Sequence, residues 1–195
     1  MADSPHLLVV GGPNGSGKTT LALEYAAETG FRYIGADAIA AEIDLAHPSH
    51  ARIAAARQFI HQIDDSIAAR ESIVVESTLS GLTMRNGITK AKSQGYVVSV
   101  AFLFVDSADV CVARVDERVR KGGHLVPEAD IRRRFLRAIA NFWTIYREMA
   151  ENWVLLYNGH TAVQDVAGGS RDRMTIREPT TFATFLDFVE SSGNG

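Results

Sequence analysis

Residues 12–19 read Gly-Pro-Asn-Gly-Ser-Gly-Lys-Thr and match the pattern G-x-x-x-x-G-K-[ST] in full. An apolar run at 7–10 precedes them and a helix-patterned stretch follows, which is the strand, loop and helix context of a phosphate-binding P-loop. The glycines let the backbone N–H groups point at an anion, and the helix adds the positive end of its dipole. We therefore expect a triphosphate site formed by Gly12, Pro13, Asn14, Gly15, Ser16, Gly17, Lys18, Thr19 and Thr20. Lys18 would reach the β- and γ-phosphates, and the Thr19 hydroxyl would bind Mg²⁺.

The composition suits one soluble domain over residues 1–195, because 46% of the 195 residues are hydrophobic and no linker interrupts them. The net charge of -3 argues against a general polyanion-binding surface, so nucleic acid is not an expected partner. No signal peptide and no apolar run of membrane-spanning length occurs. We expect no membrane partner and a cytoplasmic location.

Expected strands and helices alternate along the chain. The strands are expected at 7–11, 31–34, 73–75, 97–105 and 153–157, and the helices at 18–29, 38–43, 48–70, 82–95, after 106, and from 127 to 149. This alternation predicts a three-layer α/β P-loop fold with a mainly parallel five-stranded sheet covered on both faces. Residues 163–167 and 173–177 are expected to form a hairpin around Gly168-Gly169-Ser170, followed by a helix over 182–190.

Three acidic residues follow expected strands, at the sheet edge where ligands of open α/β sheets bind. Asp37 follows the second strand and is a candidate proton acceptor, although it could instead cap the helix at 38–43. Glu76 follows the third strand and is either an acceptor ligand or part of a Mg²⁺ site. Asp106 follows the fourth strand; it is the rival for the Mg²⁺ role, or else a helix cap.

Basic residues concentrate between 114 and 137, where eight Lys or Arg stand against four Asp or Glu. Such a cluster suits a small phosphorylated ligand. Arg114 and Arg118 share a helix face that ends at Gly122-Gly123, so they could close as a lid over the transferring phosphate. The alternative is a solvated face paired with neighbouring acids. Arg134 and His124 are further candidate ligand contacts.

Different classes of P-loop protein make different demands on the sequence. A GTPase would need an Asn-Lys-x-Asp element, which does not occur, and a transporter-type ATPase would need a signature loop before a strand that ends in Asp-Glu. The sequence at 79–81, Leu-Ser-Gly, is only superficially like that loop. A small phosphotransferase needs a base for the acceptor and a cationic lid. Asp37 and the arginines meet this demand.

The same elements resemble the zeta toxin family of P-loop kinases over residues 7–158. The likeness rests on the motif at 12–19, Asp37 after the second strand, Glu-Ser-Thr-Leu-Ser-Gly at 76–81, and the arginines of 114–134 around Gly-Gly-His. The resemblance implies a nucleoside-kinase-like core with strand order 2-3-1-4-5 and ATP with Mg²⁺ as cofactors. It further implies a small-molecule acceptor, UDP-N-acetylglucosamine in the best-known toxins, and an antitoxin protein as a candidate partner.

Family roles carry over residue by residue. Lys18 and Thr19 match the nucleotide and Mg²⁺ positions, Asp37 the catalytic base, Glu76 with Thr78 the acceptor-binding strand end, and Arg114 with Arg118 the lid arginines. Taking these roles with the positions in the sequence, we expect catalytic roles for Lys18, Asp37, Arg114 and Arg118, a metal site at Thr19 and Glu76, and acceptor contacts from Glu76, Thr78, His124 and Arg134. Ser80 stands where the toxins carry an arginine, and Gly123-His124 where a second lid arginine is expected. We expect an ATP-dependent small-molecule kinase. The alternatives are a nucleotide-binding regulator, an ATPase without acceptor activity, or a kinase for another metabolite or antibiotic.

Overall fold

The computed structural model describes residues 4–43, 52–123, 125–159, 162–171 and 173–192. Within them, seven strands form one sheet in the order β2-β3-β1-β4-β5-β6-β7. The strands are β1 (His6–Gly11), β2 (Arg32–Gly35), β3 (Ile73–Ser77), β4 (Val97–Phe104), β5 (Asn152–Asn158), β6 (Val163–Ser170) and β7 (Arg173–Ile176). The first five pair in parallel, while β6 and β7 join antiparallel. The predicted parallel order 2-3-1-4-5 is confirmed.

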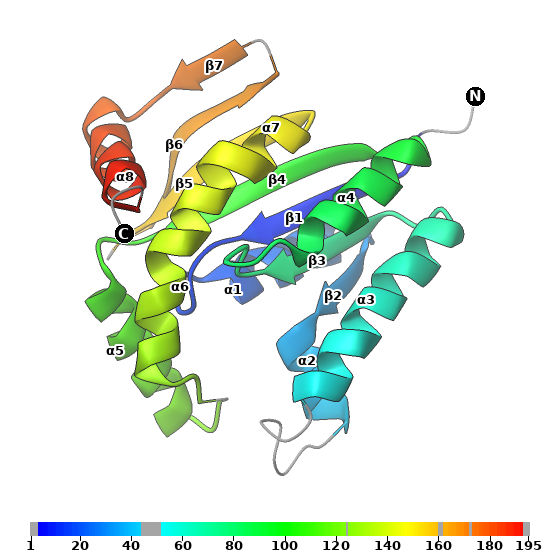
Figure 1. Cartoon of the computed structure of the whole chain (residues 1–195), viewed down its shortest axis with the longest axis horizontal. Helices are drawn as coiled ribbons and strands as arrows, with labels where there is room; N and C mark the ends of the chain where they lie inside the picture. Colours follow the sequence, from blue (N-terminus) through cyan, green and yellow to red (C-terminus); the bar gives the residue numbers. More distant parts are fainter. Residues whose placement is uncertain (1–3, 44–51, 124, 160–161, 172, 193–195) are drawn as a thin grey trace.

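Helices cover both faces of the sheet (Figure 1). In chain order they are α1 (Lys18–Thr29), α2 (Ala36–Ile43), α3 (Arg52–Ala68), α4 (Thr83–Ser93), α5 (Ala108–Arg120), α6 (Glu128–Asn141), the π-helix η1 (Phe142–Tyr146), α7 (Arg147–Met149) and α8 (Pro179–Ser192). Figure 1 shows α3, α4 and α6 in front of the sheet and α1 behind it. The chain therefore has the three predicted layers, and the carboxyl ends of its parallel strands face the gap between α2 and α5.

The core is divided by the sheet, because successive strand residues point to opposite faces. Val10, Val74 and Leu103 come from three adjacent strands and pack with Ala22 of α1. The larger cluster lies on the other face and includes Phe102, which stacks on Phe142 at 4.4 Å between ring centroids. Burial on both faces explains why the central strands read as continuous apolar runs.

The C-terminal hairpin extends the sheet to seven strands rather than standing apart from a five-stranded one. The prediction that Gly168-Gly169-Ser170 forms its turn is wrong, because all three residues lie in β6. A Cβ on Gly169 would lie 2.1 Å from the carbonyl oxygen of Arg173 on β7. These glycines therefore mark a close approach of backbones within the sheet, which is another common use of glycine in strands.

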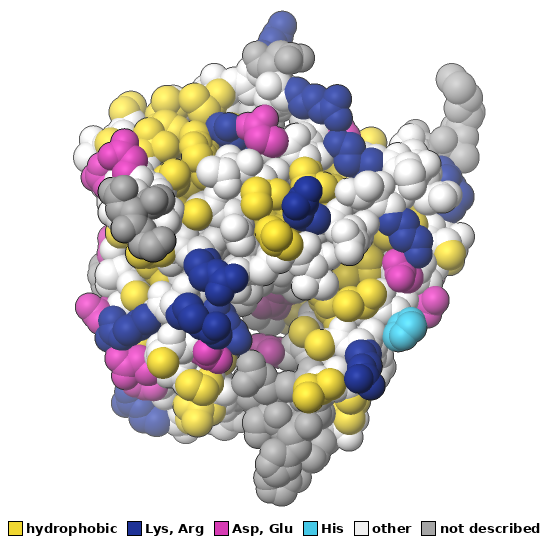
Figure 2. All heavy atoms as spheres, viewed as in Figure 1, with side chains coloured by type: hydrophobic (Ala, Val, Ile, Leu, Met, Phe, Trp, Pro, Cys, Tyr) yellow, Lys and Arg dark blue, Asp and Glu magenta, His cyan; other side chains and the backbone are white. Residues whose placement is uncertain are grey.

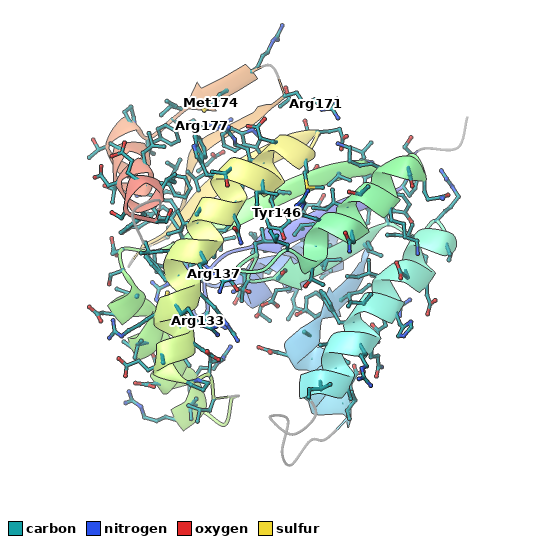
Figure 3. All side chains as sticks on the ribbon, in the orientation of Figure 1. Arg133, Arg137, Tyr146, Arg171, Met174 and Arg177 are labelled. Carbon is teal, nitrogen blue, oxygen red and sulfur yellow. The ribbon has the colours of Figure 1, made fainter. Side chains whose placement is uncertain are left out.

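The helix expected from 127 to 149 is not regular throughout, because it changes to π geometry at Phe142–Tyr146. Phe142 and Tyr146 are both fully buried there. The Tyr146 hydroxyl donates to the carbonyl of Gly81 at 2.6 Å, and the Asn141 side chain donates to the carbonyl of Leu79 at 2.8 Å. The π segment, near Tyr146 in Figure 3, thus supports the loop that follows β3. Single π turns occur frequently at functional sites.

Candidate active site

The P-loop connects β1 to α1 with a backbone that only glycine adopts readily at two points. These two are Gly15 and Gly17, with φ values of 77° and 96°, and Gly12 before them has a φ of 145°. Gly17 is the N-cap residue of α1. A Cβ on Gly15 would lie 2.8 Å from the carbonyl oxygen of Cys111. The loop can therefore curl tightly against α5, with the N-terminus of α1 facing the cavity, which is the geometry that binds phosphate.

Two buried polar atoms of the loop have no hydrogen-bond partner among the described residues. They are Oδ1 of Asn14 and Oγ of Ser16, in side chains that are 8% and 0% exposed. A buried polar atom without a partner costs about 1–3 kcal/mol. Two such atoms in one loop fit a site whose ligand supplies polar partners.

Lys18 is 5% exposed, and its ammonium donates to the carbonyl of Pro13 at 2.7 Å. Burial lowers the pKa of Lys18 below its usual value, while the negative charges of Glu76 and Asp37 act in the opposite direction. A desolvated ammonium is a strong partner for phosphate oxygens, because little hydration remains to be lost. Lys18 is placed in the loop as predicted.

Glu76 lies beside the first turn of α1, where the predicted metal ligand Thr19 stands. The Thr19 hydroxyl donates to Oε1 of Glu76 at 3.0 Å, and the Tyr33 hydroxyl donates to Oε2 at 2.7 Å. Burial, followed by the charge of Glu76, raises the pKa of Tyr33. Tyr33 was not predicted from the sequence. The sequence feature that could have indicated its role is Gly35, two residues later on the same face of β2. A Cβ on Gly35 would lie 2.2 Å from the Tyr33 hydroxyl, so the glycine leaves room for the tyrosine to lie along the strand.

Asp106, the rival of Glu76, lies away from this cluster. It is exposed, accepts a hydrogen bond from the Tyr157 hydroxyl, and does not line the cavity. The alternative that Asp106 caps a helix is wrong, because the side chain of Ser107 caps α5 by accepting from the Val110 N–H. Glu76 is thus the carboxylate that stands beside Thr19.

A cavity of about 630 Å³ opens where these elements meet. It brings together most of the residues that were predicted: Asn14, Gly15, Gly17, Lys18, Thr19, Thr20, Asp37, Glu76, Thr78, Arg114, Arg118 and Arg134. Gly12, Pro13 and Ser16 belong to the loop but do not line the cavity. His124 lies outside the described residues.

Asp37 is an exposed residue of the first turn of α2, at the end of β2. The alternative that it caps this helix is wrong, because α2 begins one residue earlier, at Ala36. Its carboxylate lines the same cavity as Lys18 and is close enough to raise the Lys18 pKa. Asp37 is thus a carboxylate at the carboxyl edge of the sheet, where a base for an acceptor hydroxyl would be needed.

Arg114 ties α5 to the end of β5. Its guanidinium donates to the carbonyls of Asn158 and Gly159, at 3.1 and 2.9 Å. The Asn158 side chain in turn donates to the carbonyl of Ser16 in the P-loop at 2.9 Å. The alternative of a solvated Arg114 paired with neighbouring acids is therefore wrong. Asn158 was not predicted, because the contact depends on the pairing of β5 with β4 beside the loop.

Arg118 lies one turn further along α5, half-buried and lining the cavity. The chain after α5 folds back on it, since the Gly123 N–H donates to the Arg118 carbonyl at 2.9 Å. A Cβ on Gly123 would lie 2.6 Å from Cγ of Arg118. Any side chain at position 123 would therefore require the Arg118 side chain or the chain after α5 to shift.

The loop after β3 is fixed in an unusual conformation. Leu79 has a φ of 55° although it is not glycine, and it is 1% exposed. Its side chain lies over Gly11, where a Cβ would be 2.4 Å from Leu79 Cδ1. A left-handed non-glycine residue costs about 1–3 kcal/mol and persists only where its surroundings hold it. The turn places the hydroxyls of Thr78 and Ser80 2.9 Å apart at the cavity.

A protein-family model described as "AAA domain" matches residues 7–138 of the chain. The chain belongs to this AAA domain family. A protein of Haemophilus influenzae named only "Uncharacterized protein" is 32% identical over 124 residues, which are 64% of this chain and 88% of that protein.

Solved structures share the fold of this AAA domain protein at low sequence identity. The AvrRxo1-ORF1:-ORF2 complex with ATP gives a TM-score of 0.71 at 18% identity, covering 94% of this chain and 64% of that chain. The PezAT toxin-antitoxin system of Streptococcus pneumoniae gives 0.65 at 13% identity, covering 99% and 87%. The predicted resemblance to zeta-toxin-like P-loop kinases is thus confirmed for the fold.

Two further features of the described residues bear on ligands and location. None of the described helices is long and apolar enough to cross a membrane. No group of three or more His, Cys, Asp or Glu side chains in the described ranges could hold a metal ion by itself. A Mg²⁺ ion at Thr19 and Glu76 would therefore need further oxygen ligands, which phosphates and water commonly supply.

Proposed function

We propose that this AAA domain protein is an ATP-dependent phosphotransferase that moves the γ-phosphate to a hydroxyl of a small-molecule acceptor. The observation that carries the proposal is that Asp37, Lys18 and Arg118 line one cavity. A triphosphate cradle alone would suit any nucleotide-binding protein. A carboxylate at the same cavity adds a group that can accept a proton from an acceptor.

The residues divide the reaction between them. Lys18 binds the β- and γ-phosphates, and Asp37 accepts the proton as the acceptor oxygen forms its bond to the γ-phosphorus. The bond between that phosphorus and the β,γ-bridging oxygen breaks, and ADP leaves. Arg118 stabilises the charge on the transferring group. Thr19 and Glu76 fit a Mg²⁺ ion, which when bound would neutralise charge on the β- and γ-oxygens.

The second candidate is a nucleotide-binding regulator or an ATPase without an acceptor. The test is to incubate the full chain with ATP, Mg²⁺ and a panel of sugars, nucleotide sugars, nucleosides and alcohols, and to search for phosphorylated products by mass spectrometry. ATP binding without any phosphorylated product would favour the second candidate. An antitoxin stays a candidate partner, supported by the fold shared with the PezAT system.

The role of Asp37 is tested by Asp37→Asn, which keeps the shape of the side chain but removes the proton acceptor. Transfer to the acceptor is expected to fall by roughly 10²- to 10⁴-fold, whereas ATP affinity by calorimetry should stay close to that of the wild type. Glu42→Gln is the matched control, because Glu42 is an exposed acid of the same helix that does not line the cavity. Full transfer by the Asp37→Asn protein, or loss of its ATP binding, would contradict the assignment.

A further inference from the structure

The cavity has two unlike sides. On the side of α2 and α3, every described lining residue except Asp37 is apolar; these are Ala36, Ala40, Ala55, Ala56 and Phe59. On the side of α5 and α6 the lining includes Arg114, Arg118 and Arg134. Figure 2 shows this division as a recess with basic side chains on the α5 and α6 side and hydrophobic ones on the α3 side. Acidic side chains lie between them.

The cations nearest the P-loop belong to the site of the phosphate donor. Lys18 is part of the P-loop, and Arg114 is bound to the loop after β5, beside Asn158. Arg134 lies 3.3 Å from a carboxylate oxygen of Asp130, so its charge is already partly balanced. Arg133 and Arg137, labelled on α6 in Figure 3, do not line the cavity.

The opposite side of the cavity, formed by α2, α3, the start of α4 and the loop after β3, is here called the acceptor side. A nucleotide sugar as acceptor would bring a second pair of phosphates to this side. Proteins bind such groups with arginine, lysine or backbone N–H donors. Of the described residues lining the acceptor side, the loop after β3 offers Ser80 and Thr78, which are neutral hydroxyls. Thr83 and Met84, at the start of α4, continue this lining without charge. The described part of the acceptor side therefore suits an apolar body and offers it a few hydroxyls.

From this asymmetry we infer that the acceptor is a compact alcohol with an apolar ring and without a diphosphate group. The ring would pack against Ala56 and Phe59 and the reacting hydroxyl would face Asp37. The inference rests on the proposed function, and it narrows the acceptor to one chemical class. A compact acceptor also agrees with the volume of the cavity, because its 630 Å³ must hold the donor phosphates as well as the acceptor.

The test uses two alanines of α3 that differ in which way they face. Ala54 and Ala56 are both exposed, but only Ala56 lines the cavity. Ala56→Lys places an ammonium where the ring would pack, and Ala54→Lys is the matched control. The probes are 2-phenylethanol, glucose and UDP-N-acetylglucosamine, each with ATP and Mg²⁺. Binding to the complex with a non-hydrolysable ATP analogue is measured by ligand-detected NMR, and phosphorylation by mass spectrometry.

We expect 2-phenylethanol to bind and to be phosphorylated in preference to both sugars. Ala56→Lys should weaken its binding by about tenfold, because a charge then meets an apolar surface, while Ala54→Lys should leave it unchanged. Preference for UDP-N-acetylglucosamine, tighter acceptor binding by Ala56→Lys, or equal effects of the two variants would overturn the inference. If 2-phenylethanol binds as expected but no probe is phosphorylated, the acceptor class stands and the proposed transfer reaction fails.

Discussion

Replacing Lys18 by methionine should separate nucleotide binding from folding. The ammonium of Lys18 is buried against the Pro13 carbonyl and desolvated. A charge-assisted hydrogen bond contributes about 1.5–3 kcal/mol, and Lys18 would make such bonds to two phosphates. Its loss should cost about 3–6 kcal/mol of ATP binding, which is about 10²- to 10⁴-fold in affinity. Replacing a buried charge by an apolar side chain of similar length is often neutral or stabilising, so the free energy of unfolding should not fall.

The pH dependence of stability provides a second measurement. Burial lowers the folded-state pKa of Lys18 below its usual 10.5. At a pH between the lowered pKa of the folded state and the usual 10.5 of the unfolded chain, Lys18 binds more protons in the unfolded chain than in the folded protein. Lys18 therefore makes the free energy of unfolding increase as the pH rises towards 10.5. The Lys18→Met protein should lack this contribution, and its urea midpoint should rise less than that of the wild type as the pH approaches 10.

The assays are calorimetric titration with ATP and urea unfolding at several pH values. Lys90→Met is the control, because the Lys90 ammonium pairs with Asp64 on the surface. Unchanged ATP affinity in the Lys18→Met protein would mean that the loop is not a working nucleotide site. A large loss of stability at neutral pH would refute the reasoning about desolvation.

Two other variants test positioning at the site. Tyr33→Phe removes a hydroxyl that donates to Glu76. The affinity of the ATP-bound protein for Mn²⁺, measured by electron paramagnetic resonance, should then fall by about tenfold, the cost of one hydrogen bond to a charged group; unchanged affinity would mean that the Tyr33 hydroxyl does not position a metal ligand. Arg114→Ala should raise the KM for ATP more than it lowers kcat, because Arg114 binds backbone carbonyls beside the P-loop, whereas Arg118→Ala should lower kcat by roughly 10²- to 10³-fold. The opposite division in steady-state kinetics would exchange these two roles.

Much of the fold follows from local patterns in the sequence. The helix at 18–29 is confirmed at the predicted residues, because the P-loop before it and the glycine after it, Gly30, which caps it with a φ of 75°, are both local signals. The π turn could not be predicted, since the spacing of Phe142 and Tyr146 also fits an α-helix. The glycines of β6 were misassigned for a related reason: a glycine pair predicts a turn as well as it predicts a close approach of strands.

The site residues that could be predicted are those whose side-chain type suits the reaction and whose place in the sequence, directly after a strand, puts them at the binding edge of the sheet. Asp37 and Glu76 each follow a strand, and the shared edge of a parallel sheet brings them to one cavity. Tyr33 and Asn158 were missed because their roles depend on which strands become neighbours. Tyr33 reaches Glu76 only through the pairing of β2 with β3.

The contact between Gly11 and Leu79 links two sequence positions that lie far apart. The side chain of Leu79 occupies the space that a Cβ on Gly11 would need. A homologue with a larger residue at position 11 must therefore carry a smaller one at 79, or shift the loop that bears Thr78 and Ser80. In an alignment of many relatives these two positions should change together. The glycine in front of the P-loop thus constrains the shape of a loop that lies more than sixty residues further along the chain.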